Sequence, residues 1–232
     1  MIEEPVKLTI KKPIRRPSAA QIAAFQGVPT GFVVDAMDGT GALASTIRPV
    51  GEGRDVKCIA AGPALTVDSG PADVLALMGA LSFIQAGDMV VTAFNAYQGC
   101  AACGDRVAGM MKNNDAAGFV TDGPIRDYPG VVDVGLPVWC SGISPNSPVA
   151  QGPGRVGLPI QIGGREVETG DMIVADQDGV VVVPFEGIET VISRLEQIEQ
   201  LEKALDRRVA DGLKAFPGIA ELLDSNQTRV VD

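Results

Sequence analysis

The amino-acid sequence predicts a mixed α/β domain, and three observations support this. Apolar, strand-like runs alternate with helical segments in the first half of the chain. Short strands separated by Gly and Pro turns cluster between residues 136 and 184, and a long amphipathic helix follows. Because alternation favours layered helices and strands and a late cluster of strands favours a second sheet, we expect two sheets or a barrel-like stack.

The chain begins with a polar segment, residues 1–17, which contains three prolines and is expected to form an extended arm. Ser18, with Gln21 three residues later, has the pattern of a capping box, and predicts a helix over about 18–26. A second helix is expected over 31–38, ended by the glycines that follow it.

The middle of the chain alternates between strands and helices. The apolar string 58–67 predicts a strand, with a bulge or bend at Gly62-Pro63. Apolar side chains at helical spacing predict a helix over 72–85 that ends at Gly87. The elements expected next are a buried strand over 88–94, a helix over 105–113 and a strand over 118–121.

A five-residue string, Gly-Asp-Met-(Val/Ile)-Val, occurs at 87–91 and again at 170–174. Each time the Gly-Asp pair leads into a β-branched run, which predicts two equivalent strand entries.

The predicted late helix, 186–211, has a polar outer face and one apolar stripe. The stripe consists of Ile188, Val191, Ile192, Leu195, Ile198, Leu201, Leu205 and Val209. Because the helix is long for its flanks, we expect it to pack on a neighbouring subunit. The predicted organisation is an arm (1–17), a single domain (18–211) and a C-terminal tail (212–232).

Charge and hydropathy exclude several classes of partner. The formal net charge is −10 and the pI is about 4.5, so the chain would repel a nucleic acid backbone. No apolar stretch approaches the roughly 20 residues of a membrane helix, and the N-terminus lacks the apolar core of a secretory signal. The sequence therefore predicts a cytoplasmic protein with no nucleic acid or membrane partner.

The chain contains no histidine, which removes several catalytic arrangements. A Ser-His-Asp triad, a Cys-His pair and an H-E-x-x-H zinc site are all excluded. Acid–base chemistry would therefore rely on carboxylates, Lys, Tyr or metal-bound water.

Four cysteines are present, and Cys100 and Cys103 form a C-x-x-C motif. The motif is compatible with a redox pair or with half of a zinc site, whose other ligands would have to come from Cys58 and Cys140. Neither of those lies in a second paired motif, so we expect buried or incidental thiols.

The strongest candidate site lies at two predicted element ends. The strand 118–121 runs into a turn that delivers Arg126 and Asp127, a planar fork for a carboxylate or enolate beside an oxygen ligand for a hard cation. Gly104 and Asp105 open a predicted helix, whose free amides favour an anion. Residue chemistry alone also allows a surface ion pair or an Asp that caps a turn.

Asp105, twenty intervening residues and then Arg126-Asp127 match the D-x20-R-D signature of the RraA-like superfamily. The run from Gly118 to Asp127, the segment 136–139 and the block 170–184 also resemble that family, and the resemblance spans about residues 20–205. The superfamily includes class II 4-hydroxy-4-methyl-2-oxoglutarate and 4-carboxy-4-hydroxy-2-oxoadipate aldolases.

The resemblance implies an α/β fold of the swivelling α/β/β type, a phosphohistidine-domain-like sandwich, assembled as a homotrimer or dimer of trimers. It implies that Asp127 ligates Mg²⁺ or Mn²⁺ and that Asp105 contacts metal-bound water. A glutamate from the late helix of a neighbouring subunit would complete the water shell; Glu202 matches best by position, and Glu199 is the alternative.

The resemblance also implies a substrate site. Arg126 would bind the pyruvyl oxygens of a small 2-oxo acid, while the backbone after Gly104, at Arg106 and Val107, would hold its carboxylate. The implied reaction cleaves a 4-hydroxy-2-oxo dicarboxylic acid to pyruvate through an enolate, with oxaloacetate decarboxylation as a side activity. Lys112, the nearest lysine, is expected to be a solvated helix residue.

Two questions stay open at this point. Cys100, Cys103, Phe94 and Tyr97 depart from the family's pattern, and either reshape the pocket or pack within the core. Some members of the superfamily bind and inhibit an RNA-degrading endonuclease without turnover, and an acidic protein would suit a basic partner surface. A non-catalytic regulator is therefore the alternative function.

Overall fold

The structure is a computed structural model that describes residues 4–12 and 14–231. The chain divides between Leu195 and Glu196 into two compact units. The predicted bounds of the arm, domain and tail stay a prediction. In the described residues, no helix is both long and apolar enough to span a bilayer.

The first unit is built on a nine-stranded mixed sheet with the order β1-β7-β3-β4-β5-β6-β2, to which β10 and β11 attach at β3. Its strands are β1 Leu8–Ile10, β2 Arg48–Pro49, β3 Ala60–Asp68, β4 Met89–Ala93, β5 Gly118–Thr121, β6 Val138–Cys140, β7 Gly154–Val156, β10 Met172–Ala175 and β11 Val180–Val183. A separate hairpin pairs β8 Ile160–Ile162 with β9 Arg165–Val167. The predicted mixed α/β fold is confirmed.

The helices largely follow the sequence prediction. They are α1 Ala19–Ala24, α2 Thr30–Ala36, α3 Leu75–Ala80, α4 Asp105–Asn113, α5 Tyr128–Val134, α6 Ile188–Ala210 and α7 Ile219–Leu223. The predicted helix 72–85 is shorter in the structure, because Asp73 accepts the Leu75 amide at its start and the chain tightens into a 3-10 turn at Leu81–Phe83. Ser18 and Gln21 form the predicted capping box.

Strand β3 joins two sets of partners. Its first residues pair with β10, up to Pro63 opposite Met172, and its later residues pair with β4, starting with Ala64 opposite Met89. The predicted bend at Gly62-Pro63 thus falls where the partners change. A Cβ at Gly62 would lie 2.0 Å from the Gly87 carbonyl oxygen, so only glycine fits there.

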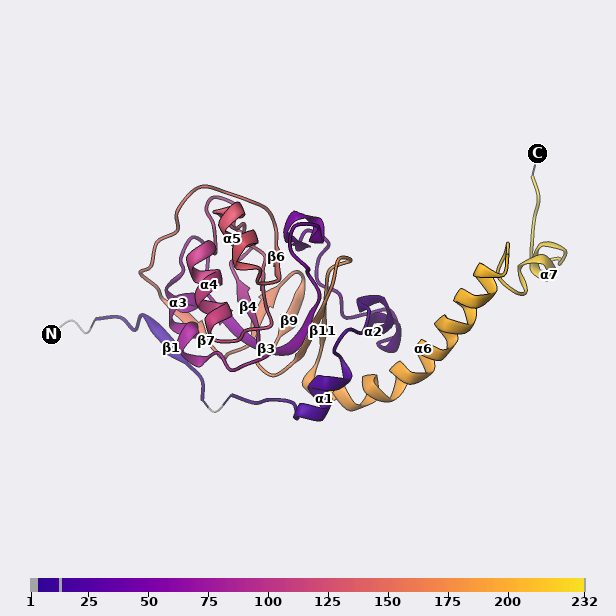
Figure 1. The fold of residues 1–232 in the computed structure, drawn as a ribbon, viewed down its shortest axis with the longest axis horizontal. Coiled ribbons are helices and arrows are strands. Elements are labelled where there is room, and N and C mark those ends of the chain that lie inside the picture. Colours follow the sequence, from indigo (N-terminus) through magenta and orange to yellow (C-terminus); the bar gives the residue numbers. More distant parts are fainter. Residues whose placement is uncertain (1–3, 13, 232) are drawn as a thin grey trace. The chain divides into compact units, whose positions relative to one another are not determined.

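The central strands β3, β4, β5 and β6 run parallel and are buried, with Phe119 and Trp139 fully enclosed. The Trp139 indole donates to the Asp176 carbonyl at 2.7 Å. Figure 1 shows α3, α4 and α5 gathered over one face of this sheet, with α4 packed beside α5. The carboxyl ends of β4 and β5 lead into α4 and α5, which places a site at that edge.

The repeated Gly-Asp strings do begin two strands, β4 and β10, as predicted. The carboxylates of Asp88 and Asp171 each accept a hydrogen bond from the backbone amide three residues earlier, with N···O distances of 2.9 and 2.8 Å. The N-terminal segment contacts the turn before β4, because Arg16 forms a buried ion pair with Asp88. β1 also pairs with β7, so the predicted extended arm is part of the sheet.

The late helix α6 buries only part of its predicted stripe. Ile188, Val191 and Leu195 are buried, whereas Leu201 and Val209 are 69% and 57% exposed. The exposed pair lies in the second unit, beyond the division at residue 195. Packing of this part of α6 on another subunit stays a prediction.

Candidate functional site

Backbone hydrogen bonds bring the two halves of the candidate site together. Ile125 forms isolated bridges to Cys103 on one side and to Ile143 on the other. The Arg126 amide donates to the Cys103 carbonyl at 2.9 Å. The structure therefore places the start of α4 directly beside the segment that carries Arg126 and Asp127.

The side chains of Arg126 and Asp127 contact each other. The Arg126 Nε donates to Asp127 Oδ2 at 3.1 Å, and the two side chains are 38% and 45% exposed. Asp127 precedes α5 with a left-handed backbone, φ 56°. Non-glycine residues in this conformation are uncommon and gather at functional sites.

Ser147 is a contact that the sequence did not reveal. Its hydroxyl accepts a hydrogen bond from Arg126 Nη1 at 2.6 Å and so fixes the guanidinium on the side away from Asp127. Ser147 lies 21 residues further along the chain, in a Pro-rich loop with no periodic pattern. Nothing in the local sequence indicates this pairing.

Asp105 lies against the first turn of α5. A Cβ at Gly130 would lie 2.6 Å from Asp105 Oδ2, and a Cβ at Gly104 would lie 2.7 Å from Asp127 Oδ2. Glycine at both positions therefore leaves room for the two carboxylates. The predicted set Asp105, Arg126 and Asp127 gathers around the ends of two adjacent helices.

Asp122 stabilises the loops that lead into the site. Its buried carboxylate accepts the amides of Phe94 and Ala96 at 2.6 and 2.8 Å, and so ties the turn after β4 to the end of β5. Burial raises the pKa of this carboxyl above its ordinary value, and the two amides oppose the rise. Asn95 and Ala96 are left-handed at this turn.

The start of α4 offers backbone donors as predicted, but one is already used. The Arg106 amide donates to the neighbouring Asp105 Oδ1 at 2.6 Å. Within the described residues, the Val107 amide makes no hydrogen bond. A substrate carboxylate at Arg106 and Val107 stays a prediction, and it would share the Arg106 donor with Asp105.

The donor set suits a hard divalent cation held by few protein ligands. In the described part of the chain, no three His, Cys, Asp or Glu side chains gather closely enough to bind a metal ion. Mg²⁺ commonly keeps several waters and takes only one or two carboxylates. Asp127 would provide a direct carboxylate ligand and Asp105 would hold one of the waters, with Oδ2 of each beside a glycine that leaves space.

A small pocket of about 100 Å³ adjoins Arg126. It is lined by Val74, Leu77, Met78, Ala101, Ala102, Cys103, Gly104, Val107, Arg126 and Pro148. The pocket thus includes both the start of α4 and the guanidinium, along with an apolar wall from α3.

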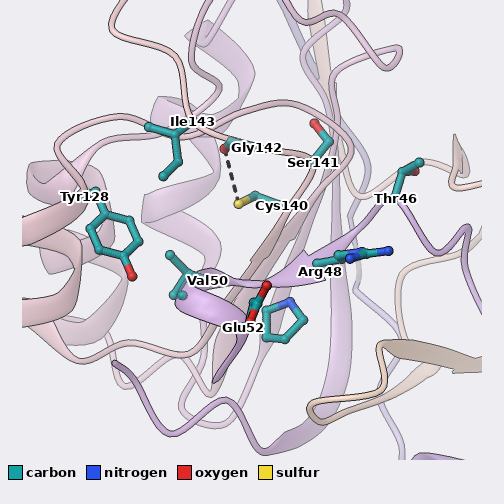
Figure 2. A pocket seen from close by; sticks show the side chains of 11 residues that line it. Thr46, Arg48, Val50, Glu52, Tyr128, Cys140, Ser141, Gly142 and Ile143 are labelled. Carbon is teal, nitrogen blue, oxygen red and sulfur yellow. Dashed lines mark hydrogen bonds between the residues drawn. The ribbon is translucent and has the colours of Figure 1, made fainter. Parts of the chain in front are cut away.

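A second pocket, of about 330 Å³, is lined in part by Tyr128, the residue after Asp127. Figure 2 shows Cys140 in its middle, with Tyr128 on one side and Arg48 on the other. The Tyr128 hydroxyl donates to Asp55, and this bond raises the pKa of the phenol. Tyr128 and Arg126 line different pockets.

All four cysteines are buried free thiols, as expected. Cys103 lines the pocket beside Arg126, and burial raises the pKa of its thiol to about 12. Burial likewise raises the pKa of the other three. Phe94 and Cys100 pack together in a small apolar cluster, which favours the packing interpretation for these two residues.

These thiols are expected to be unreactive in the folded protein. Because a raised pKa keeps a thiol protonated near neutral pH, little nucleophilic thiolate forms. Titration with an aromatic disulfide at pH 7.5 should label less than one thiol in native protein and all four in denaturant. Rapid labelling of two thiols before unfolding would contradict this prediction.

Glu202 and Glu199 both lie in α6, in the second compact unit. Glu199 forms an ion pair with Lys203 at 2.5 Å, whereas Glu202 is half-buried. Their proposed approach to the site of a neighbouring subunit stays a prediction.

Comparison with known proteins identifies the fold. The crystal structure of Streptomyces coelicolor RraAS2, described as an unusual member of the RNase ES inhibitor RraA protein family, matches with a TM-score of 0.74 and 27% identity, over 83% of this chain and all of that one. An uncharacterised protein of Pseudomonas syringae matches with a TM-score of 0.75 and 23% identity, over 88% and 94%. The fold is therefore that of the RraA proteins, as the sequence predicted.

Sequence comparison identifies the family to which the chain belongs. A relative from Halalkalibacterium halodurans, provisionally named a 4-hydroxy-4-methyl-2-oxoglutarate aldolase, is 35% identical over 202 residues, 86% of this chain and 93% of its own length. The RraA-like family model, described as Aldolase/RraA, matches residues 30–182. This chain belongs to the Aldolase/RraA family.

Proposed function

We propose that this protein is a divalent-metal-dependent class II aldolase that cleaves a 4-hydroxy-2-oxo dicarboxylic acid to pyruvate. The observation that carries the proposal is the meeting of Arg126, Asp127 and Asp105 at the ends of β4 and β5. The provisional name of the 35% identical relative supports the same reaction class.

Asp127 would ligate Mg²⁺ or Mn²⁺ directly, and Asp105 would hold a water of that ion. Glu202 from a neighbouring subunit, or Glu199, would bind further waters in a homotrimer or a dimer of trimers. When bound, the cation supplies a positive charge that stabilises negative charge on the substrate's oxygens. One direct carboxylate, with the remaining positions filled by water and substrate, suits either ion.

Arg126 acts on the oxygen that gains charge as the C3–C4 bond breaks. Cleavage leaves a pyruvate enolate, and a fixed guanidinium aimed at its oxygen lowers the barrier. Ser147 and Asp127 hold the guanidinium from two sides, so little reorganisation is needed. The Arg106 and Val107 amides, after Gly104, would orient the C1 carboxylate.

Asp105 takes part in proton transfer. The C4 hydroxyl must lose its proton for the bond to break, and without histidine a carboxylate is the suitable relay at this position. Asp105 Oδ1 is engaged by the Arg106 amide, which leaves Oδ2 for the relay. Loss of CO₂ from oxaloacetate yields the same enolate, so decarboxylation is expected as a side activity.

A pyruvate assay tests the proposal. Purified protein with Mg²⁺ or Mn²⁺ should release pyruvate from 4-hydroxy-4-methyl-2-oxoglutarate, detected by a coupled dehydrogenase. A chelator should abolish the release, and excess cation should restore it, because the enolate charge would otherwise lack its main partner. Full activity after exhaustive chelation would contradict the metal requirement.

A binding function without turnover is the second candidate. The similarity to a structure described as an RNase ES inhibitor family member and the net charge of −10 both favour it. The same assay separates the two, since a pure binder releases no pyruvate from any 2-oxo acid offered with Mg²⁺ or Mn²⁺.

A further inference from the structure

The N-terminal arm carries positive charge in an acidic protein. Residues 7–16 contain three lysines, two arginines and no acidic residue, whereas the net charge of the whole chain is −10. The Aldolase/RraA family model matches from residue 30 onward, so the arm lies outside the part of the chain that defines the family. The role of these cations therefore has to come from their own contacts.

Arg15 binds the domain through two acidic side chains and an aromatic ring. Its Nη1 lies 2.7 Å from Glu186 Oε1, and its Nη2 lies 3.8 Å from Glu168 Oε2. The guanidinium carbon lies 3.9 Å from the centre of the Phe185 ring. The Arg15 side chain is 42% exposed, so each contact is weak by itself, but together they fix this part of the arm.

Arg16 and Lys12 provide two further anchors. Arg16 pairs with Asp88, whose side chain is fully buried. Lys12 Nζ lies 4.6 Å from the centre of the Phe83 ring. Contacts made by exposed cations weaken as ionic strength rises, because salt screens them. Apart from the pairing of β1 with β7, the arm is thus held on the domain mainly by charge.

Two glycines of the domain leave room for the backbone of the arm. A Cβ at Gly170 would lie 2.6 Å from the Arg15 carbonyl oxygen, and one at Gly157 would lie 3.0 Å from the Lys11 carbonyl oxygen. Both glycines also have positive φ, which favours glycine independently. The surface of the domain therefore admits the arm at close range.

Helix α3 depends on its neighbours for stability. It has only six residues, and isolated helices shorter than roughly 12–15 residues are marginal in water. Strands β3 and β7 contact it, and so does β1. The Leu8 side chain lies against Gly79, where a Cβ would come within 2.6 Å of Leu8 Cδ2. Because Phe83 lies in the 3-10 turn that follows α3, Lys12 holds the arm at the end of the same element.

The first half of α3 belongs to the candidate site. Val74, Leu77 and Met78 line the small pocket beside Arg126. The Met78 amide donates to the Val74 carbonyl at 3.0 Å and so closes the first turn of the helix. Local opening of α3 would break this hydrogen bond and displace the apolar wall of the pocket.

We propose that the arm is a strap, held by charge, that stabilises α3, so that its release loosens the wall of the pocket beside Arg126. The proposal does not depend on which reaction the site catalyses. While the arm is bound, Leu8 packs on Gly79 and supports the helix. When ionic strength rises or an anchor is lost, that support weakens, and the amides of α3 exchange with solvent more readily.

Hydrogen exchange of the full-length protein, followed by mass spectrometry, tests the strap. In about 500 mM NaCl, compared with about 50 mM, the arm and the segment 74–83 should both exchange about threefold faster or more. Arg15→Ala at low salt should have the same effect, by about fivefold, because an ion pair and a cation–π contact are lost. Helix α5, which packs against α4, should keep its exchange rate and reports on global unfolding.

Lys11→Ala is the matched control. It removes the same charge from the same arm, and in the described part of the chain the Lys11 side chain is exposed and forms no ion pair. It should leave both segments at wild-type exchange. Arg15 contacts no residue of α3, so a faster exchange there has to be transmitted by the arm. Faster exchange of the arm with an unchanged segment 74–83, no response to salt, or equal effects of Lys11→Ala and Arg15→Ala would each overturn the proposal.

Discussion

Replacement of Arg126 by alanine is expected to lower kcat/KM for pyruvate release by about a thousandfold, with the fold retained. Loss of a single donor to a developing oxyanion costs about 10² to 10³ in rate, and Arg126 would provide both charge and donors. The side chain is 38% exposed, so its removal opens no core cavity. Coupled pyruvate detection measures the loss, and circular dichroism with thermal unfolding checks the fold.

Arg54→Ala provides the control for this prediction. Arg54 is 80% exposed and, among the described residues, pairs only with Glu52, so its removal changes the charge equally while the contacts of Arg126 with Asp127 and Ser147 stay in place. It should retain wild-type kcat/KM. A folded Arg126→Ala variant with wild-type pyruvate release would refute the assigned role of the guanidinium.

The sequence predicted the elements that carry the site with good accuracy. α4 and β5 have the predicted bounds, because Gly104 opens the helix and the polar residues 113–115 separate the helix from the strand. These are local signals, read within a few residues. The juxtaposition of Asp105 with Arg126-Asp127 came from the signature spacing, and parallel pairing of β4 and β5 explains it, since both helices then start at one edge.

Other features depended on contacts between distant segments and could not be read locally. Ser147 reaches Arg126 only because the loop after β6 folds back over Ile125. β1 is a strand only because β7 lies beside it. The sequence did not predict α5, because Pro129 and Gly130 are residues typical of a turn. Pro is nevertheless well accepted in the first turn of a helix, where Pro129 lies.

The late helix α6 shows what an apolar stripe can and cannot predict. Its stripe predicts burial along the whole length, yet periodicity specifies only which side of a helix is apolar and not what covers it. Within this chain, Ile188 and Val191 find a partner surface, and Leu201 does not. The assignment of Glu202 to a neighbouring site depends on what covers that part of α6.

Gly104→Ala is expected to reduce kcat/KM by about a hundredfold, since displacement of catalytic groups by about 1 Å costs on that order. The new Cβ would lie 2.7 Å from Asp127 Oδ2 and 3.3 Å from Arg126 Nε, so both side chains must move. Gly104 has an extended backbone, φ −133° and ψ −177°, which alanine adopts without strain. The variant should therefore unfold near the wild-type temperature and bind Mn²⁺ more weakly, which calorimetry would measure.

Gly109→Ala separates this effect from a general response of α4. Its Cβ would meet only Val134 Cγ2, at 3.8 Å, and replacement of a helix-interior glycine by alanine stabilises by roughly 0.5–1 kcal/mol. This variant should keep its activity and unfold at a slightly higher temperature. A methyl group at Gly104 meets Arg126 and Asp127, whereas one at Gly109 does not. Equal activity in the two variants would therefore mean that Arg126 and Asp127 do not need the space at Gly104.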